Sequence, residues 1–335
     1  MTEEVNQEIL LIKRPVGIPT ENDFKLVDKP IPNPGDGEVL VRNIYMSVDP
    51  YMRGRMIDQE SYVPPFELNK TLQGGCVGEV VKSNNNKYQA GEYVFSMIGW
   101  RKYYVSDGTG LTKVDSSIAP IQAYLGILGL TGLTAYVGLL DIGQLKEGET
   151  VFVSGASGAV GSVVCQIAKI NNCYVLGSAG SDEKVKWLLD ELEIDAAFNY
   201  KTVSNLTSEV RKKCTKGVDV YFDNVGSSHL DAALANMNTF GRIVGCGMIS
   251  QYNLARPDSI QNLITIIPRR LTIRGFIITD HYNQMPDFMR DMGAWIKEGK
   301  IKWKETIIEG IEKAPSAFIG LFKGENIGKM LVKLD

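Results

Sequence analysis

The sequence predicts an α/β protein in which a doubly wound parallel sheet follows a region of irregular antiparallel β structure. Three observations support this fold class. Apolar, β-branched runs alternate with helical stretches from residue 151 onward, which is typical of a parallel sheet. The first of these runs ends in a glycine-rich turn that opens a helix. The first 120 residues instead hold short extended runs separated by Pro and Gly pairs, the pattern of antiparallel strands and turns.

The elements can be placed in chain order. The first region contains the extended runs EVLVRNIYMSV, GGCVGEVVKS and EYVFSMIGWRKYYVS. Residues 122–140 carry scattered small residues, and we expect a buried helical connection there. Parallel strands are then expected at VFVSG, CYVLGSA, AAFNY, VDVYFDNVG, RIVGCG and LTIRGFII. Helices are expected between them, at SVVCQIAKI, DEKVKWLLDEL and HLDAALANM.

The C-terminal part has helical apolar spacing at PDFMRDMGAWIKEGKI and ends in KMLVKLD. A closing strand needs a sheet to join, so we expect this tail to return to the first domain. One domain is therefore expected at residues 1–124 and 293–335, and the other at residues 125–292.

The turn in VFVSGASGAVG predicts a dinucleotide-binding unit. Gly155 and Gly158 would allow a tight turn and a close approach to a pyrophosphate, and Gly161 would allow the helix to pack on the strand. The helix start offers N–H groups and a positive dipole end to phosphates. The spacing is GxxGxxG and not the commoner GxGxxG, and a purely structural strand–turn–helix is the alternative.

The end of the second parallel strand favours NADP(H) over NAD(H). An NAD site usually places an acidic residue there, which accepts hydrogen bonds from the ribose hydroxyls. This strand ends instead in the small, uncharged residues Gly177–Gly180, and Lys184 follows one turn into the next helix. Those residues leave room for a 2′-phosphate that Lys184 could reach. Alternatively, Ser181 caps the helix and Lys184 is solvated.

Composition excludes several functional classes. The chain has 335 residues, 44% of them hydrophobic, and a net charge of −3, which is ordinary for a globular protein and argues against nucleic acid as a partner. No apolar run approaches the roughly 20 residues of a membrane span. The N-terminus is acidic where a signal peptide would be basic, and the five cysteines form no CxxC pair. We therefore expect a cytoplasmic protein with reduced cysteines.

Histidine is scarce, with only His229 and His281 in the chain. A catalytic zinc site takes three protein ligands, and the sequence has no clustered set of them. A serine hydrolase would need an oriented histidine base. The sequence therefore predicts neither a metal site nor a Ser-His-Asp triad.

The motifs together resemble the medium-chain dehydrogenase/reductase superfamily. They are most similar to its zinc-independent branch of leukotriene B4 12-hydroxydehydrogenase, prostaglandin reductase and alkenal double-bond reductase. The resemblance runs over nearly the whole chain, through MSVDPYMRGRM, LGLTGLTAYVGL, GASGAVGSVVCQIAK, GSAGSDEKV, FNYKT, DVYFDNVG, GRIVGCGMISQYN and GENIGKMLVK. It implies a GroES-like substrate domain, a Rossmann NADP(H)-binding domain, a small-molecule substrate and a homodimer.

The resemblance also implies roles for individual residues. Lys184 and Tyr200 would bind the 2′-phosphate, Cys246–Tyr252 would line the nicotinamide side, and Phe276–Ile278 would hold the carboxamide by backbone. The full set of implied cofactor contacts is Gly155, Gly158, Ala159, Val160, Gly161, Lys184, Tyr200, Asn224, Cys246, Gly247, Met248, Ile249, Ser250, Tyr252, Phe276, Ile277, Ile278 and Asn326.

The chain departs from parts of the superfamily pattern. The zinc-bearing branch has a GHE motif where this chain has LQGGCVGEV, so Gly75 stands near the expected ligand histidine. Thr131 and Gly155 replace a Pro and an Ala that are frequent in relatives. An alcohol dehydrogenase that uses zinc is therefore disfavoured.

Without metal or histidine, the site must work with the cofactor's hydride and with hydrogen bonds. Reduction of the double bond of an α,β-unsaturated aldehyde or ketone suits those resources, because the enolate oxygen that forms needs only a donor. Tyr252 is the first candidate for that donor and Tyr51 the second, although Tyr51 could equally anchor a loop.

The neighbours of Tyr51 leave alternatives open. Arg53 and Arg55 could attract an acidic substrate tail or be solvated, and Met52, Met56, Tyr62 and Phe66 could line a pocket or belong to a core. Two rival functions also remain: a quinone reductase of the zeta-crystallin type, and an NADPH-binding protein without turnover.

Overall fold

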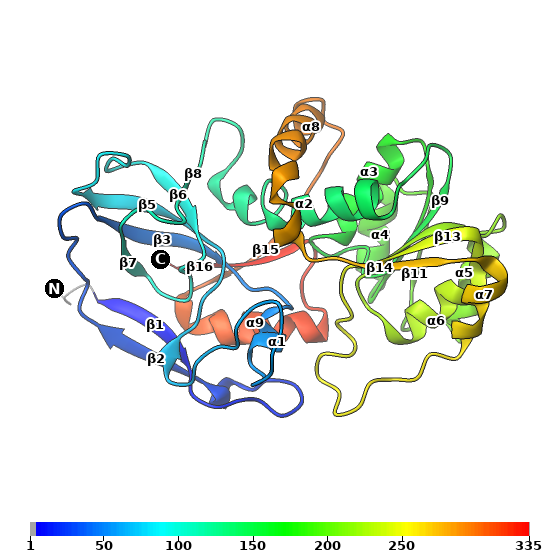
Figure 1. Cartoon of the computed structure of the whole chain (residues 1–335), viewed down its shortest axis with the longest axis horizontal. Coiled ribbons are helices and arrows are strands. Elements are labelled where there is room, and N and C mark those ends of the chain that lie inside the picture. The colour runs from blue at the N-terminus through cyan, green and yellow to red at the C-terminus, as the bar shows by residue number, and fades with distance from the viewer. Residues whose placement is uncertain (1–4, 335) are drawn as a thin grey trace. The chain divides into compact units, whose positions relative to one another are not determined.

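The structure, a computed structural model, describes residues 5–334, which form two compact units (Figure 1). The first unit contains the chain up to Gly126, then Glu305–Asn326 and the stretch from Met330 onward. The second unit contains Ile127–Lys304 and Ile327–Lys329. The domain boundaries expected at 124/125 and 292/293 remain predictions. In the structure, the residues up to Lys304 belong to the second unit.

The first unit holds two antiparallel sheets. In the smaller sheet, β1 (Asn6–Leu11) lies between β2 (Phe24–Lys29) and β4 (Lys70–Thr71). The larger sheet has the order β15 (Glu305–Glu309), β16 (Lys329–Lys333), β3 (Val39–Ser47), β5 (Cys76–Ser83), β6 (Tyr93–Ser96) and β8 (Thr112–Lys113), and β7 (Tyr103–Ser106) also pairs with β3. Because β16 pairs with β3, with Leu331 opposite Ser47, the expected return of the tail is confirmed.

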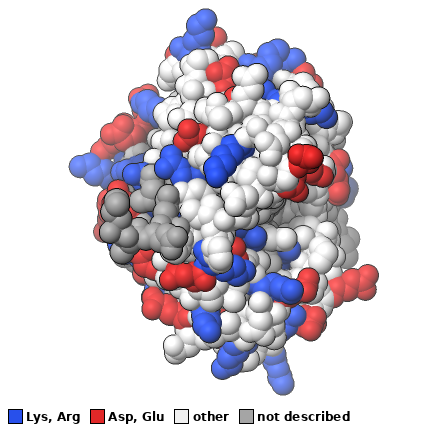
Figure 2. All heavy atoms as spheres, turned by 90° about the vertical axis from the view of Figure 1, so that its left-hand side faces the viewer, with Lys and Arg blue, Asp and Glu red and all other residues white. Residues whose placement is uncertain are grey.

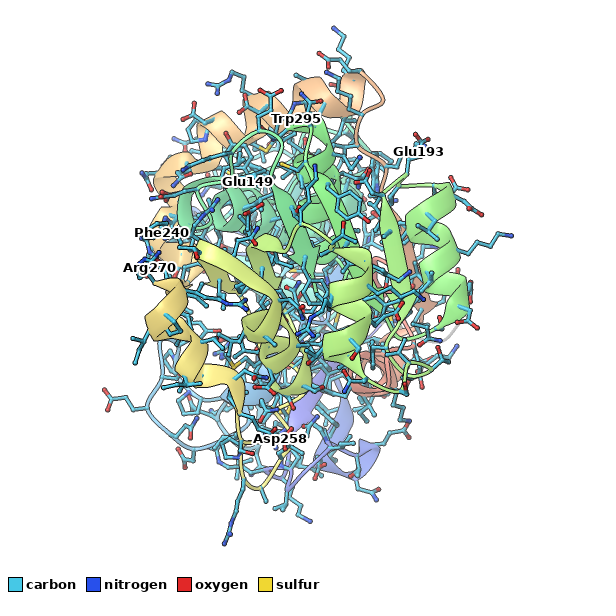
Figure 3. The ribbon with its side chains drawn as sticks, turned by 90° about the vertical axis from the view of Figure 1, so that its right-hand side faces the viewer. Glu149, Glu193, Phe240, Asp258, Arg270 and Trp295 are labelled. Carbon is cyan, nitrogen blue, oxygen red and sulfur yellow. The ribbon has the colours of Figure 1, made fainter. Side chains whose placement is uncertain are left out.

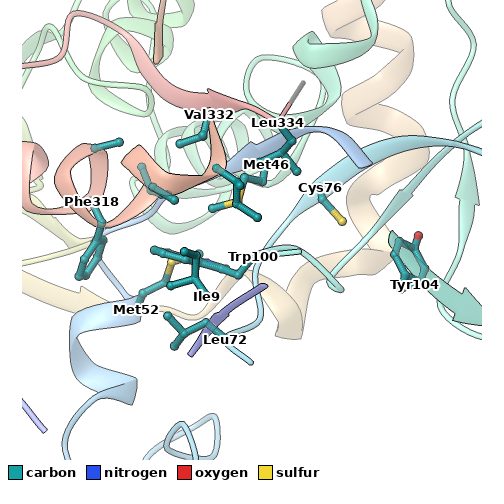
Figure 4. Close-up of a cluster of buried hydrophobic side chains, with 14 of the residues drawn as sticks. Ile9, Met46, Met52, Leu72, Cys76, Trp100, Tyr104, Phe318, Val332 and Leu334 are labelled. Atoms are coloured by element: carbon teal, nitrogen blue, oxygen red, sulfur yellow. The ribbon is translucent and has the colours of Figure 1, made fainter. Parts of the chain in front are cut away.

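The C-terminal tail also completes the core of this unit. Phe318 of α9 (Ala314–Lys323) packs edge-on against the fully buried Trp100, with ring centroids 6.4 Å apart. Figure 4 shows Phe318, Val332 and Leu334 with Met46 and Ile9 in one cluster. Burying such side chains contributes roughly 1.5–3 kcal/mol each, so the tail and the N-terminal strands stabilise one another.

The face of the molecule in Figure 2 carries acidic and basic side chains interspersed. No single-sign field covers that face, in keeping with the net charge of −3. Within residues 5–334, no helix combines the length and apolarity that crossing a bilayer requires.

The second unit contains a six-stranded sheet whose neighbouring strands are all parallel. Its order is β11 (Ala196–Asn199), β10 (Tyr174–Ala179), β9 (Thr150–Val153), β12 (Val218–Asp223), β13 (Met237–Gly245) and β14 (Thr272–Gly275). This order reverses between β9 and β12, as in a Rossmann fold. All six expected strands are confirmed, and so is the predicted fold class.

The helices of this sheet also follow the sequence pattern. They are α3 (Gly161–Ile170), α4 (Asp182–Asp190), α5 (Leu206–Lys213) and α6 (Ser227–Asn236), and Figure 1 shows α3 and α6 on opposite sides of the sheet. The sheet side chains beneath them include Phe152 and Tyr221, stacked with centroids 4.9 Å apart. A short helix, α7 (Ile266–Arg269), precedes β14.

The helical connection expected at residues 122–140 is interrupted. A 3-10 turn at Ile121–Leu125 ends at Gly126, and α2 (Leu130–Val137) begins after Gly129 and continues into a π-turn. Non-helical backbone at both glycines, extended at Gly129, breaks what the small residues suggest is one helix. Helix α8 (Met285–Lys297) packs on α2, where the Tyr136 hydroxyl donates to Asp291 at 2.7 Å.

Candidate cofactor and active site

The predicted cofactor residues of the second unit gather at the carboxyl ends of its strands. Gly155 follows β9 and Asn224 follows β12, and a Cβ on Gly155 would lie 3.5 Å from that of Asn224. These two strands flank the point where the strand order reverses, which is where ligands bind in open parallel sheets. The fold therefore brings the glycine turn and Asn224 together.

The glycine turn has the backbone that its sequence predicts. Gly155 has a φ of +58°, a left-handed conformation that favours glycine, and its carbonyl accepts the Gly158 N–H at 3.0 Å. A Cβ on Gly161 would collide with the Gly155 carbonyl oxygen, so that glycine permits the close start of α3. The backbone at Ala159 and Val160 leads directly into this helix, where the Ser162 N–H donates to the Gly158 carbonyl at 3.0 Å and the Val163 N–H donates to the Val160 carbonyl at 3.1 Å.

A segment from near the C-terminus lies against the same turn. The Gly328 N–H donates to the Ser157 carbonyl at 2.8 Å, and Gly328 forms a bridge with Gly158. Gly328 has a φ of +67°, and a Cβ there would collide with the Lys304 carbonyl oxygen. Asn326, the predicted cofactor contact in the first unit, precedes this segment by two residues.

The ends of β10 and β11 form the predicted 2′-phosphate site. A Cβ on Gly180 would lie 3.0 Å from the Tyr200 hydroxyl, so Gly180 allows that hydroxyl to lie over the strand end. Lys184 is buried to 9% exposure, and its backbone N–H donates to the Ser181 hydroxyl at 3.3 Å. Burial, together with the charge of Lys201, lowers the pKa of Lys184, while burial raises that of Tyr200.

Two features at this site fit an anion. A half-buried tyrosine with a raised pKa remains a donor at neutral pH. The charge of Lys201 lowers the pKa of Lys184 and that of Glu183 opposes this, and a phosphate would attract both ammonium groups. The capping of α4 by Ser181 and an anion contact by Lys184 are therefore compatible, since capping uses only the Lys184 backbone.

A buried carboxylate that we did not predict organises the loops around the site. Asp223, at the end of β12, is 1% exposed and accepts from the Tyr221 hydroxyl at 2.8 Å and from the Gly226 N–H at 2.7 Å. Burial raises the pKa of Asp223, although these donors oppose it. Ser154, after β9, donates to the same carboxylate at 3.2 Å.

Ser154 also holds Asn224. The Ser154 hydroxyl accepts the Asn224 N–H at 3.0 Å, and the Asn224 amide donates to the Ser154 carbonyl at 2.8 Å. No sequence pattern indicated this network beyond a polar residue at the end of an apolar strand.

The loop after β13 carries Tyr252. The Cys246 and Gly247 N–H groups both donate to the Asp223 carbonyl at 3.0 Å, and the loop then turns back. The Tyr252 hydroxyl accepts the Met248 N–H at 3.1 Å, and a Cβ on Gly247 would lie 3.1 Å from it. The hydroxyl is therefore held over the start of its own loop, beside the carboxyl end of β13.

The other residues of this loop follow from the same fold. The Ile249 N–H donates to the Asn224 carbonyl at 3.3 Å, and the Ser250 hydroxyl donates to the Val225 carbonyl at 2.6 Å. The predicted segment Phe276–Ile278 follows β14, and a Cβ on Gly138 would lie 2.8 Å from the Phe276 ring. The Phe276 ring packs against the end of α2, so the Phe276 side chain points to α2 and its backbone lies at the end of β14.

The first unit contains the second candidate, Tyr51, at the start of α1 (Met52–Arg55). Its ring packs against the core of that unit. Burial lowers the pKa of the Arg55 guanidinium, and the nearby Tyr51 hydroxyl opposes that shift. Arg55 lies 4.0 Å over the Phe66 ring and donates to the Pro64 carbonyl at 2.9 Å.

Arg53 is not a solvated or substrate-facing residue. It is 4% exposed and donates to the Pro15 and Gly17 carbonyls at 3.4 and 3.0 Å, because the backbone of that loop turns its oxygens inward. Met52, Met56 and Phe66 lie in the hydrophobic core, as the structural alternative predicted, whereas Tyr62 is 60% exposed.

Comparisons with known proteins agree with this fold. Residues 7–114 match the family described as the N-terminal domain of oxidoreductase, and residues 159–294 match the family described as zinc-binding dehydrogenase. A putative NADP-dependent oxidoreductase, YfmJ of Bacillus subtilis (strain 168), is 50% identical over 98% of both chains. The NADP(+)-dependent 2-alkenal reductase of Nicotiana tabacum is 43% identical over 100% of this chain and 99% of its own.

The chain belongs to the medium-chain dehydrogenase/reductase family. A solved structure, CurA of Vibrio vulnificus in complex with NADPH, superposes with a TM-score of 0.93 at 41% identity, over 98% of this chain and 99% of that one. The predicted family is thereby confirmed, in its branch of alkenal, prostaglandin and curcumin reductases.

The family includes zinc enzymes, but the residues at the corresponding place here do not suit zinc. A Cβ on Gly75 would face the Phe95 ring at 3.5 Å and Leu125 at 3.6 Å, an apolar environment. Burial raises the pKa of the adjacent Cys76 thiol to about 11, so it stays protonated. In the described part of the chain, no three His, Cys, Asp or Glu side chains are grouped to hold a metal.

Proposed function

We propose that this chain reduces the carbon–carbon double bond of α,β-unsaturated aldehydes and ketones with NADPH. Relatives named for the reduction of 2-alkenals, curcumin, pulegone and prostaglandins support this activity. These relatives and the bacterial oxidoreductase YfmJ are 39–50% identical to this chain. The observation that carries the proposal is Tyr252, whose phenol is held by a backbone N–H beside the carboxyl end of β13.

NADPH would be held by residues of the second unit. Gly155–Gly161 and the start of α3 would receive the pyrophosphate, and Lys184 and Tyr200 the 2′-phosphate. Asn224, the loop Cys246–Tyr252 and the backbone at Phe276–Ile278 would face the nicotinamide end, with Asn326 closing over it. When bound, NADPH supplies a hydride from carbon 4 of its nicotinamide ring.

Tyr252 would stabilise the charge that develops on the substrate. When the β-carbon gains a hydride, the electron pair of the double bond moves toward the carbonyl, and the oxygen becomes an enolate. A phenol is a hydrogen-bond donor, so Tyr252 can donate to that oxygen. The α-carbon then takes a proton from solvent, which completes the saturated product. Tyr51 is the second candidate for this donor.

The first prediction concerns Tyr252→Phe. Removing one donor to an oxyanion lowers kcat by roughly 10²–10³-fold, and we expect a loss of that order with the affinity for NADPH retained. Turnover is measured as NADPH oxidation with a panel of 2-alkenals and enones, and affinity by quenching of NADPH fluorescence. Tyr51→Phe is the matched comparison. Unchanged kcat in Tyr252→Phe together with a large loss in Tyr51→Phe would reassign the donor to Tyr51.

The same panel distinguishes the rival functions. Faster NADPH oxidation with simple quinones than with any enal or enone would identify a quinone reductase. Fluorescence quenching by NADPH without oxidation by any of these compounds would identify a binding protein. Equal rates with NADH and NADPH would remove the proposed roles of Lys184 and Tyr200.

We also propose a homodimer in the cytoplasm. Strand β14 is the last strand of its sheet, and Ile273 on it is 44% exposed. Helix α7 and its approach add exposed apolar side chains, with Ile264 at 69% and Ile267 at 73%. Such a patch beside a sheet edge suits pairing with a second copy. The five cysteines, which form no disulfide, support a reducing compartment.

A further inference from the structure

The segment that follows Tyr252 is connected to helix α6 by one exposed carboxylate. The Ser227 hydroxyl donates to Asp258 Oδ2 at 2.5 Å, and the Gln251 side-chain amide donates to the same oxygen at 3.2 Å. In return, the Asp258 N–H donates to Gln251 Oε1 at 2.8 Å. Gln251 and Asp258 therefore close the loop on itself, and Ser227 ties it to the helix. Figure 3 shows Asp258 on the long segment that extends from the sheet.

These bonds join the two loops predicted to contact the cofactor. Ser227 is the first residue of α6 and follows directly on the loop of Asn224. Gln251 precedes Tyr252, and its amide also donates to the Ser250 hydroxyl at 2.9 Å, which itself donates to the Val225 carbonyl. The end of β12 and the end of β13 are thus linked by side chains at a point beyond both strands.

The segment has little else to hold it in place. Every residue from Leu254 to Ser259 is exposed, so no apolar core fixes its path. A displacement of about 1 Å can lower a rate by roughly 10²-fold when a group must meet a reacting atom. Backbone bonds to Asp223, Asn224 and Val225 hold the loop up to Ser250, and the Asp258 carboxylate adds two side-chain bonds that hold Gln251 and the segment after Tyr252.

We infer that Asp258 is a positioning residue that, through Ser227 and Gln251, holds the Tyr252 hydroxyl in its working place. This inference rests on the proposed role of Tyr252 in the reaction. Asp258 touches neither cofactor nor substrate in this scheme and acts only by restraining the loop.

The test uses Asp258→Ala in the full chain. Losing the hydrogen bonds of a charged acceptor is expected to lower kcat about tenfold, with NADPH affinity changed less than about threefold. Asp258→Asn keeps an acceptor oxygen for Ser227 and is expected to restore most of the rate. Asp287→Ala is the control, because it removes an equally exposed carboxylate that is bonded to Arg290 at 2.5 Å on α8, away from this loop.

Two readouts separate positioning from a general structural effect. In a double-mutant cycle, Asp258→Ala should add no further loss to Tyr252→Phe, because both changes remove the same interaction. Hydrogen exchange of residues 248–260 should be faster in Asp258→Ala than in the unaltered protein and in Asp287→Ala.

Multiplicative losses in the cycle, or unchanged exchange in the loop, would overturn the inference. Full turnover by Tyr252→Phe would instead overturn the proposed role of Tyr252 and with it the purpose of the restraint. Loop exchange would then still report whether Asp258 holds the segment, so the two failures are distinguishable.

Discussion

Lys184, the proposed contact of the 2′-phosphate, carries a charge that lowers the stability of the unliganded fold. Its pKa is lowered by burial and by Lys201, so its charge is less favourable in the folded than in the unfolded chain. This destabilisation is present at neutral pH and disappears only as pH rises above the ordinary pKa of lysine. A phosphate at this site would offset it, which is the arrangement expected of a group selected for binding.

We predict that Lys184→Ala raises the KM for NADPH by about 10- to 100-fold, since a charge-assisted bond contributes roughly 1.5–3 kcal/mol. The KM for NADH should stay nearly constant, because NADH lacks the 2′-phosphate. The melting temperature of the unliganded protein should not fall. Lys186→Ala, at an exposed position on the same helix, is the control, and an equal rise for both cofactors would contradict the prediction.

Glu8 makes the opposite contribution, to stability of the first unit. It is 6% exposed and accepts from Lys29 at 2.8 Å and from Asn6 at 3.0 Å. Burial raises the pKa of Glu8, but bonds from Lys29 and Thr71 and the charge of Arg101 outweigh it, so the pKa lies below 4.5. The carboxylate therefore stabilises the fold above that pH, and this contribution is lost as pH falls through the lowered pKa.

Accordingly, Glu8→Gln is expected to lower the free energy of unfolding by about 1.5–3 kcal/mol at pH 7. The difference from the unaltered protein should shrink at an acidic pH below the lowered pKa of Glu8, where the native carboxylate takes up a proton. Urea unfolding at the two pH values measures it. Asp28→Asn, whose carboxylate accepts an exposed bond from Gln7 at 3.3 Å, should change stability little at either pH.

Residues differ in how far their sequence context predicts their place. Lys184 could be placed because it lies one helical turn after a recognisable strand, whereas Tyr200 was assigned by the family resemblance. Arg53 could not, since its carbonyl partners at Pro15 and Gly17 are distant in the sequence. The same holds for Asp223, whose role depends on Ser154 from another strand.

At the scale of elements, the glycine turn combines two different constraints. Gly155 is required by backbone conformation, since its φ is +58° while the nearest side-chain atom to a Cβ would be 3.5 Å away. Gly161 is required by space, since a Cβ would meet the Gly155 carbonyl. Gly155 could accept a side chain at the cost of backbone strain. A side chain at Gly161 would force the start of α3 to move.

We therefore predict that Gly155→Ala lowers stability by about 1–2 kcal/mol, the cost of a left-handed alanine, and weakens NADPH binding modestly. Gly161→Ala should lower stability more, because the helix must shift away from the strand, and should abolish detectable NADPH binding. Thermal unfolding and NADPH fluorescence measure the two effects. Equal effects in the two variants would show that packing and conformation do not act separately here.

Strands were predictable where apolar runs were bounded by turns, and all six of the parallel sheet were found. The connection at 122–140 was predicted as one helix because its small residues are compatible with helix packing. They instead serve close approaches: a Cβ on Gly138 would lie 2.7 Å from the Phe222 ring. Composition alone does not distinguish a glycine that lets two elements pack closely from a glycine that ends a helix.

At the scale of the whole molecule, the chain closes each unit with residues remote in sequence. The first unit needs β16 and Phe318 from the C-terminal tail, and Gly328 from the same tail lies on the glycine turn of the second. Truncating the tail would therefore remove core side chains from the first unit. It would also remove the Gly328 contact with the glycine turn of the second unit. The sequence predicted the returning strand, but not the contact at Gly328, which no local pattern marks.

The proposed association of two copies is a prediction at the scale of the whole molecule. Phe240 is 63% exposed at the end of the sheet that carries β14, and the guanidinium of Arg270 lies 4.5 Å over its ring (Figure 3). With Ile264 and Ile267 it forms exposed apolar surface that a monomer would leave in water. Burying such surface contributes about 25 cal/mol per Å², enough to favour association if the partner presents the same face.

We predict that Ile264→Glu combined with Ile267→Glu converts a dimer into a folded monomer, because two carboxylates would have to be buried without partners. Sedimentation velocity measures the mass, and circular dichroism checks the fold. Val16→Glu, at a 96% exposed position of the first unit, should leave the mass unchanged. A dimer that persists in the double variant would place the interface elsewhere. A monomer in the unaltered protein would overturn the proposed homodimer.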